Sequence, residues 1–311
     1  MGTSRSAAAP PAGAGAPIPG PAAYPDHLRA LVDDYLDAIV FSGAPGLAGL
    51  EEAMRYSLLA PGKRIRPVLA LATAGALRAD PARFLPLAAA LELIHTYSLI
   101  HDDLPAMDDD ELRRGRPTCH VAFGENVAIL AGDALYAEAF RHVLAQQAGP
   151  PERVLRALAA LAGATGVDGM VGGQYLDVTG RGAPGPDGLR ALHALKTGRL
   201  IGAAVECVII LEDVGYAARG HYGRFAAELG VLFQIVDDIL DVTGTDAALG
   251  KPSGSDERHG KRTYVSEYGL TRARQLAADS HSGARRSLDA AAPRGAEELH
   301  QITDFIYTRT S

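Results

Sequence analysis

Two stretches decide what this chain can be: Ser98-Leu99-Ile100-His101-Asp102-Asp103-Leu104-Pro105-Ala106-Met107-Asp108 and Phe233-Gln234-Ile235-Val236-Asp237-Asp238-Ile239-Leu240-Asp241. In both, carboxylates sit among apolar residues, where they repel one another and are costly to remove from water unless a cation lies between them. Magnesium prefers oxygen ligands and commonly takes one or two carboxylates together with phosphate oxygens. The two stretches therefore predict a cavity in which metal ions hold a diphosphate.

The two acidic clusters differ in their expected geometry. Asp237 and Asp241 are four residues apart, so a helix places them on one face, with Asp238 beside them. A straight helix would put Asp102 and Asp108 on different faces, but Pro105 disrupts the helix between them and lets the chain fold Asp108 back toward Asp102. Asp103 could point either way. The acidic residues that follow are expected to point to solvent: Asp109, Asp110 and Glu111.

Two alternative roles for the acidic clusters have less support. The second cluster could be a helix end that emerges into water, because Gly244 follows it, but the neighbouring Val236, Ile239 and Leu240 look buried. The first cluster could be a calcium-binding loop. It lacks the glycine placement and the terminal glutamate that an EF-hand needs.

Basic residues near the acidic clusters indicate which ligand fits. The run Pro61-Gly62-Lys63-Arg64-Ile65-Arg66-Pro67 is predicted to open a helix, whose amide donors and positive end favour an anion. Further cations follow the clusters or end a helix: Arg113, Arg114, Arg116, Lys196, Lys251 and Lys261. Any one of them could be an ordinary solvated side chain. Together they predict one diphosphate held through metal ions and a second held by arginine and lysine alone.

Bulk composition limits the other possibilities. The chain has 311 residues, is 47% hydrophobic and can bury a large core. Its net charge of −7 gives no support to nucleic-acid binding. Cys119 and Cys207 are expected to be packed thiols in a reducing compartment, so we predict a cytoplasmic location.

The first 23 residues, of which 17 are Ala, Pro or Gly, are predicted to form a disordered tail. They lack the apolar core of a secretory signal. A transit peptide remains open because the tail has no acidic residue, and Met1–Ser6 fits the loose myristoylation pattern. No run reaches the ~18 apolar residues that a spanning helix needs, and Glu206 interrupts Leu200–Leu211, so we predict no membrane span.

The rest of the chain has the spacing of helices, with apolar residues recurring every three and four positions and no convincing strand. The expected helices cover residues 28–39, Leu85–Ile100, Asn126–Gln147, Glu152–Ala164, Gly188–Leu211, His221–Val242 and Thr271–Ala291. Several are apolar nearly all round, which is typical of helices inside a bundle. Because no internal linker divides the chain, we predict a single all-α domain over residues 24–311.

These motifs resemble those of the trans-isoprenyl diphosphate synthases, most closely the bacterial farnesyl diphosphate synthase type. The first aspartate motif runs from Leu93 through Asp108 and continues to Thr118. The other matching motifs are Phe123-Gly124, Ala128–Leu135, Gly172-Gly173-Gln174, Lys196-Thr197-Gly198 and Asp237–Asp241. The resemblance covers residues 26–311. It implies the isoprenoid synthase fold (about ten or more helices around a central cavity), a homodimer, and magnesium with about three ions per active site.

The resemblance also assigns roles to individual residues. The metal ligands are expected to be Asp102, Asp103, Asp108, Asp237, Asp238 and Asp241. Isopentenyl diphosphate is expected to bind Lys63, Arg66, His95 and Arg114, although His95 on its own would be taken for a core histidine. The allylic diphosphate is expected to bind Arg113, Lys196, Thr197, Gln234, Lys251 and Lys261. The residues expected to carry the catalysis are Asp102, Asp103, Asp108, Arg113, Lys196 and Asp237.

The reaction that the resemblance implies needs both the metal ligands and the diphosphate-binding residues. Metal ions neutralise the charge that builds on the leaving diphosphate, and the double bond of isopentenyl diphosphate attacks the allylic cation before a proton is lost. Tyr97 and Ser98 lie about one turn before Asp102, where an aromatic ring would close the floor of the cavity. In the resembled family this arrangement goes with farnesyl diphosphate. Geranylgeranyl or geranyl diphosphate is the alternative product.

Three other functions compete with this one. A terpene cyclase would share the fold, but it usually lacks the second aspartate cluster and needs no metal-free diphosphate site. A non-catalytic partner subunit would be expected to have lost some of the aspartates. A purely structural helical protein would leave both clusters unexplained.

Overall fold

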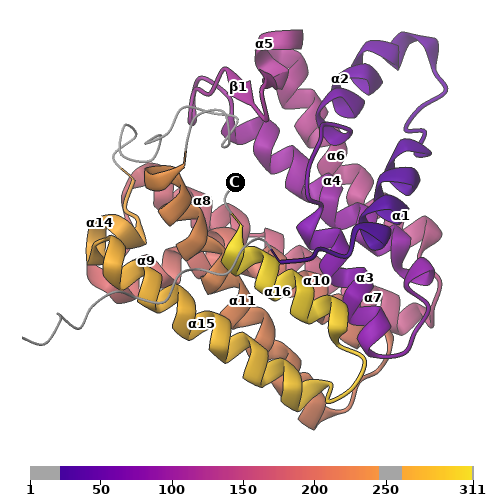
Figure 1. Cartoon of the computed structure of the whole chain (residues 1–311). Helices are drawn as coiled ribbons and strands as arrows, with labels where there is room; N and C mark the ends of the chain where they lie inside the picture. The colour runs from indigo at the N-terminus through magenta and orange to yellow at the C-terminus, as the bar shows by residue number, and fades with distance from the viewer. Residues whose placement is uncertain (1–21, 245–260, 310–311) are drawn as a thin grey trace, which may run out of the picture.

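Helices make up almost everything that the computed structural model describes, which is residues 22–244 and 261–309 (Figure 1). Within these ranges the only strands are β1 (Leu112–Arg113) and β2 (Arg116–Pro117), which form an antiparallel hairpin with Leu112 opposite Pro117. The all-α prediction is confirmed. The tail motif Met1–Ser6 and most of the proposed tail lie outside the described residues.

The helices follow one another with short connections. The first half of the chain contains α1 (Asp26–Asp37), η1 (Pro45–Leu47), α2 (Ala48–Leu58), α3 (Ile65–Ala76), η2 (Pro81–Phe84), α4 (Leu85–Asp102), α5 (Cys119–Phe123) and α6 (Glu125–Gln146). The second half contains α7 (Pro151–Thr165), α8 (Met170–Thr179), α9 (Gly185–His193), η3 (Ala194–Gly198), α10 (Arg199–Leu211), α11 (Tyr216–Thr243), α14 (Tyr264–Tyr268), α15 (Leu270–Ala291) and α16 (Glu297–Thr308).

Most of the expected helices have these bounds to within a few residues. The largest difference is in the segment expected to be one helix over Gly188–Leu211. There a π-helical turn, η3, separates α9 from α10. A π-helical turn widens the helix by one residue and re-aims the side chains it carries, and such turns are frequent at functional sites.

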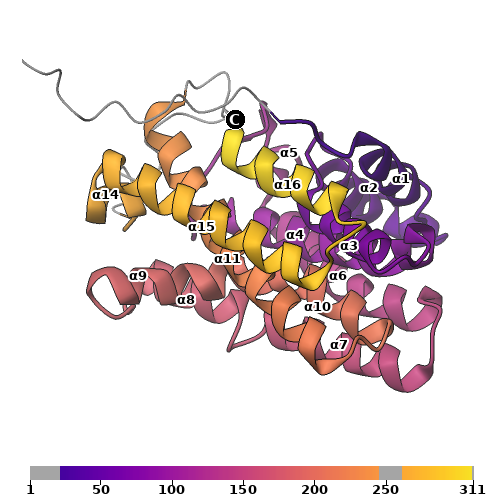
Figure 2. The same cartoon turned by 60° about the horizontal axis from the view of Figure 1, so that its bottom comes forward.

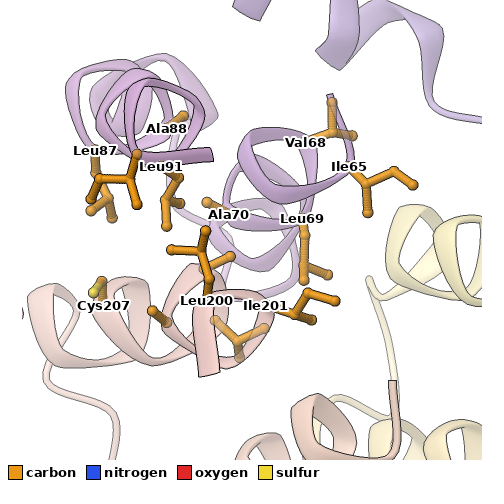
Figure 3. Close-up of a cluster of buried hydrophobic side chains, with 14 of the residues drawn as sticks. Ile65, Val68, Leu69, Ala70, Leu87, Ala88, Leu91, Leu200, Ile201 and Cys207 are labelled. Carbon is orange, nitrogen blue, oxygen red and sulfur yellow. The ribbon is translucent and has the colours of Figure 1, made fainter. Parts of the chain in front are cut away.

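Helices α3, α4 and α10 form the centre of the bundle. Leu69, Leu87, Leu91 and Leu200 from these helices point into the space between them, and each is at most 1% exposed (Figure 3). Helix α4 is rich in Leu and Ala, has Pro86 in its first turn and is apolar on nearly every side, so it suits an interior position. It packs along α6, while α11 packs along α15 (Figure 2). The helices that carry the two acidic clusters, α4 and α11, therefore belong to the interior of the molecule.

Two helical stretches, Pro81–Asp102 and Pro151–Thr179, are long and apolar enough to cross a membrane by length and composition alone. Buried core helices pass the same test, and 61% of the apolar window in the first stretch is buried inside the protein. These stretches give only weak support to a membrane span.

The turn before α3 is fixed by an ion pair inside the protein. Arg64 immediately precedes α3, and its φ of 53° places its backbone in the left-handed region. Its Nη1 donates to Glu92 Oε1 at 2.7 Å and its Nε donates to Asp33 Oδ1 at 2.9 Å. Arg64 and Glu92 are 5% and 2% exposed. No sequence pattern indicates a role for Arg64, and the structure assigns it to the scaffold that holds its neighbours Lys63 and Arg66.

Replacing Arg64 by methionine is expected to lower the free energy of unfolding by about 3–5 kcal/mol, because Glu92 would be left as a buried charge without its partner. Urea denaturation at neutral pH measures the effect. The double variant Arg64→Met/Glu92→Met should recover much of the loss, since it removes both charges. If the double variant were less stable than Arg64→Met, the loss would not come from an unpaired carboxylate.

Candidate active site

One cavity of about 730 Å³ collects most of the residues expected to bind substrate or metal. Its lining comes from α3, α4 and the turn that follows it, the β1–β2 hairpin, α8, α9, η3, α11, the segment before α14, and Arg309 beyond the end of α16. Segments far apart in the sequence therefore meet around a single space. Both acidic clusters contribute to its wall.

The first acidic cluster has the folded-back geometry expected from Pro105. Helix α4 ends at Asp102, and the backbone N–H of Asp108 donates to the carbonyl of Asp102 at 2.9 Å. Both carboxylates line the cavity. Gln174 of α8 donates to Asp102 Oδ1 at 2.7 Å, and the Lys261 ammonium lies 2.8 Å from Asp108 Oδ2. This part of the prediction is confirmed.

Asp103 and Asp110 both turn toward Arg113 rather than toward the cavity centre or solvent. Arg113 Nε donates to Asp103 Oδ1 at 2.6 Å, and Arg113 Nη2 lies 3.3 Å from Asp110 Oδ2. Asp103 is only 3% exposed. The prediction that Asp110 points to solvent is wrong, because the hairpin brings Arg113 back over it and leaves its side chain 16% exposed. Asp109 and Glu111 are exposed, as expected.

The second cluster lies on α11, and its three carboxylates have different surroundings. Asp238 is 1% exposed and accepts from Gln234 Nε2 and from the backbone N–H of Tyr264, both at 2.7 Å. Asp241 is also buried. Asp237 is the most open, with a side chain 55% exposed and Oδ1 3.1 Å from Arg309 Nη2. A helix end emerging into water does not fit this burial.

The π-helical turn η3 presents Lys196 and Thr197 to the same cavity. Lys196 pairs with Asp177 of α8, and Thr197 Oγ1 donates to Gln234 Oε1 at 2.9 Å. Because Gln234 in turn bonds Asp238, a continuous chain of hydrogen bonds joins η3 to the second acidic cluster. Gly173 allows α8 to pack this closely, since a Cβ there would clash with the backbone nitrogen of Lys196.

A second, basic region of the cavity contains Arg66, His95 and Arg114. Burial and the neighbouring Arg66 and Arg114 guanidinium groups hold the pKa of His95 well below its usual value, so its imidazole is neutral at physiological pH. Burial also lowers the pKa of Arg66 to about 10. Gly62 leaves room for Arg114, because a Cβ there would lie 2.6 Å from Arg114 Nη1.

Of the remaining residues expected to bind diphosphate, only some line the cavity. Lys63 does not line the cavity, and its ammonium lies 5.2 Å from the centroid of the Phe305 ring. Lys261 does line it, beside Asp108. Lys251 lies outside the described residues.

The raised pKa of Asp102 shows that its negative charge is costly in this cavity, so a bound cation would stabilise the first acidic cluster. Burial raises the pKa of Asp102 to about 6; Lys196 opposes this shift, while Asp108 adds to it. Within residues 22–244 and 261–309, no three His, Cys, Asp or Glu side chains form a ready-made metal cage. Magnesium needs no such cage when phosphate oxygens complete its coordination. An all-oxygen donor set spread across the cavity fits a metal that arrives with a diphosphate.

Tyr97 and Ser98 both line the cavity from the last turns of α4. The Tyr97 ring is 8% exposed and meets the Tyr136 ring of α6 edge-on, with ring centroids 4.9 Å apart. Ser98 Oγ donates to the His95 carbonyl at 2.9 Å. Tyr97 is therefore a buried aromatic part of the cavity wall, packed against α6.

Among the cavity residues that the sequence analysis did not assign, four bear on the polar wall: Gln174, Asp177, His193 and Arg309. Gln174 stands in a matched motif, which was the one signal available for it. The others are single residues with no local pattern. Arg309 lies 4.3 Å from the Phe233 ring, and its Nε, like that of Arg66, is buried with no hydrogen-bond partner among the described residues.

His193 is a buried histidine in the cavity wall, and its titration can be tested. It is 8% exposed and stacks on Tyr264, with ring centroids 5.6 Å apart. Burial lowers its pKa to about 4. Between about pH 6.5 and 4 the unfolded chain binds a proton at His193 that the folded chain does not, so this residue lowers stability as pH falls.

The variant His193→Phe should therefore lose less stability than the wild type on acidification. We expect the difference between the two free energies of unfolding to change by up to about 2 kcal/mol from pH 7 to pH 5. Urea denaturation at both pH values measures it, and comparing the two proteins cancels the other titrating groups. Parallel pH profiles would contradict the burial of a neutral imidazole.

Comparison with known proteins identifies the class of enzyme as a trans-prenyltransferase. The chain belongs to the polyprenyl synthetase family, whose model matches residues 48–293. Use of isopentenyl and allylic diphosphates and dependence on magnesium are general in this family. The family expected from the motifs is confirmed.

The relatives include enzymes with different names. A farnesyl diphosphate synthase of Geobacillus stearothermophilus is 46% identical over 85% of this chain and 90% of its own length. That of Escherichia coli is 42% identical over 92% of this chain and 99% of its own. A chloroplastic geranylgeranyl pyrophosphate synthase of Capsicum annuum is also 42% identical, over 89% of this chain and 76% of its own.

Solved structures confirm the isoprenoid synthase fold. A geranyltransferase of Helicobacter pylori, in complex with magnesium and isoprenyl diphosphate, has a TM-score of 0.81 and 30% identity over 91% of this chain and 96% of its own. An FPP/GFPP synthase of Zymomonas mobilis has a TM-score of 0.77 and 34% identity over 91% of this chain and 96% of its own.

Proposed function

We propose that this enzyme condenses dimethylallyl or geranyl diphosphate with isopentenyl diphosphate and releases farnesyl diphosphate as its main product. The observation that carries the proposal is the division of one cavity into two regions. One region is bounded by carboxylates of α4 and α11, and the other by Arg66, His95 and Arg114. A metal-bound diphosphate suits the first, and a metal-free diphosphate suits the second.

Asp102 and Asp108 on one side and Asp237, Asp238 and Asp241 on the other would hold about three magnesium ions. When bound, these ions would supply Lewis-acid neutralisation of the leaving diphosphate. Asp103 is the least suited of the expected ligands, because its carboxylate is bonded to Arg113. Its role in this proposal is to hold Arg113 against the cavity.

The other polar residues that line the cavity bind and orient the substrates in this proposal. Lys196 and Arg113 place positive charge beside the first cluster, and Thr197 and Gln234 fix α11 relative to η3. In the basic region, Arg66, Arg114 and neutral His95 can donate hydrogen bonds to the second diphosphate. This holds the attacking double bond near the ionising carbon, so the condensation does not depend on an encounter in solution.

The proposed product length depends on Tyr97. Its buried ring stands in the cavity wall next to the first aspartate cluster, where it would stop an allylic tail from extending past α6. The relatives named as geranylgeranyl synthases make that longer product the main alternative.

We also propose a homodimer and a single domain over residues 24–311. One cluster of buried apolar residues extends from Leu28 in α1 to Ile306 in α16, which supports a single domain.

The proposed dimer has its own support. On α5 and α6, Val121, Ile129 and Leu130 are at least 43% exposed, which supports an apolar contact with a second copy. Sedimentation at several concentrations would test the dimer. A cytoplasmic location stays a prediction.

The function is tested by incubating the purified protein with magnesium, isopentenyl diphosphate and each allylic diphosphate in turn, and then identifying the products by chromatography. Farnesyl diphosphate from dimethylallyl and geranyl diphosphate is expected. Reactions without magnesium and without primer are the controls. Failure to elongate any primer would contradict the synthase, and a cyclic hydrocarbon formed without isopentenyl diphosphate would indicate a cyclase.

A further inference from the structure

The described chain begins with a short strap, Ala22–Pro25, that lies beside α16 (Figure 1). The backbone N–H of Ala22 donates to Thr308 Oγ1 at 3.0 Å, across 286 positions of sequence. The ring centroids of Tyr24 and Phe305 are 4.8 Å apart. The strap therefore ties the first described residues to the last turns of α16.

The same tyrosine also reaches the turn before α3. Tyr24 Oη donates to the backbone carbonyl of Lys63 at 2.7 Å. The Lys63 ammonium lies over the same Phe305 ring that Tyr24 contacts, 5.2 Å from its centroid. Burial raises the pKa of Tyr24, so the hydroxyl stays protonated and can donate at any physiological pH.

This turn delivers a cation to the basic region of the cavity. The carbonyl that Tyr24 binds belongs to Lys63, one residue before Arg64, whose backbone lies in the left-handed region, and three before Arg66. Arg66 lines the cavity, whereas Tyr24 does not. At the other end of the strap, Thr308 is followed directly by Arg309, which lines the cavity beside Phe233. The strap thus contacts two of the segments that bring guanidinium groups to the cavity, the one before Arg66 and the one that ends at Arg309.

We infer that Tyr24 is a positioning residue for the metal-free diphosphate site, which it orders by holding the Lys63–Arg66 turn against α16. Tyr24 acts through the backbone of Lys63 and touches neither substrate. The inference rests on the proposed function, because it takes isopentenyl diphosphate as the occupant of the basic region. It predicts that loss of one hydroxyl, far from the aspartate clusters in sequence, affects one substrate and not the other.

The variant Tyr24→Phe tests this, since it removes the hydroxyl and keeps the ring on Phe305. We expect the KM for isopentenyl diphosphate to rise about three- to tenfold, the range that loss of one hydrogen bond allows. The KM for geranyl diphosphate and kcat should stay within about twofold of the wild type. The matched control is Tyr35→Phe, which makes the same chemical change in α1. It removes the hydroxyl that forms a hydrogen bond with His142 Nε2 at 2.9 Å, and Tyr35 does not line the cavity.

A binding measurement separates positioning from general loosening. Calorimetric titration of isopentenyl diphosphate without magnesium should show weaker binding to Tyr24→Phe than to the wild type or Tyr35→Phe. Unchanged binding and KM in a wild type that elongates primers would overturn the inference. Equal rises in both KM values, with a fall in melting temperature, would also overturn it in favour of a structural role. A wild type that elongates nothing would overturn the proposed function instead, and the titration would then still report whether Tyr24 supports a diphosphate site.

Discussion

The variant Asp102→Asn is expected to lower kcat by about 10²- to 10³-fold or more. Asparagine keeps the size of the side chain and can still accept a hydrogen bond from Gln174, so the turn between Asp102 and Asp108 should survive. What it loses is the negative charge that would hold magnesium against the leaving diphosphate. Steady-state kinetics over a range of magnesium concentrations measure the effect, which should include a higher magnesium requirement.

The matched control for this prediction is Asp109→Asn, in the same segment and with the same chemical change. Asp109 is exposed and does not line the cavity. Its variant should keep kcat within about twofold of the wild type. An equal fall in kcat in the two variants, or a fully active Asp102→Asn, would contradict the role of Asp102 in the proposed metal site.

The variant Tyr97→Ala is expected to change the main product from farnesyl diphosphate to chains of twenty carbons or more. The Tyr97 ring is buried against Tyr136, and removing it would open the cavity toward α6, into which a longer tail could extend. Loss of a large buried side chain also costs about 3–5 kcal/mol of stability, so the assay belongs at low temperature. Chromatography of the dephosphorylated products measures chain length.

Tyr97→Phe serves as the control, because it keeps the ring and removes only the hydroxyl. Its product should have the length of the wild-type product. If Tyr97→Ala still released farnesyl diphosphate alone, another part of the wall would have to set the length. If Tyr97→Phe also lengthened the product, the hydroxyl rather than the bulk of the ring would be responsible.

Local patterns were enough to predict the helices and the nature of the ligand. The apolar spacing of Leu85–Ile100 predicted α4 to within two residues of its end, because periodicity depends on each segment alone. Pro105 correctly indicated that Asp108 returns to Asp102. Such features depend on neighbours a few positions away, so they can be read from the sequence.

Contacts between distant segments could not be predicted in the same way. In the sequence, Asp110 resembles any other solvated carboxylate, and only the hairpin places Arg113 over it. Arg309 has no motif around it, yet it reaches Asp237 across 72 positions of sequence. Nor does any pattern mark Arg64 as buried rather than as a third cation of its turn.

The sequence by itself determined that this chain forms a helical bundle with two carboxylate clusters and enough cations for two diphosphates. Helix periodicity, the break at Pro105 and the repulsion between neighbouring carboxylates are properties of short segments. Only the tertiary structure decided which cation meets which anion: Arg113 with Asp103, Lys261 with Asp108, and Arg309 with Asp237. It also brought Tyr24 to Lys63. These pairings depend on how whole helices pack, because a charge interacts with whatever lies within a few ångströms of it, however distant in sequence.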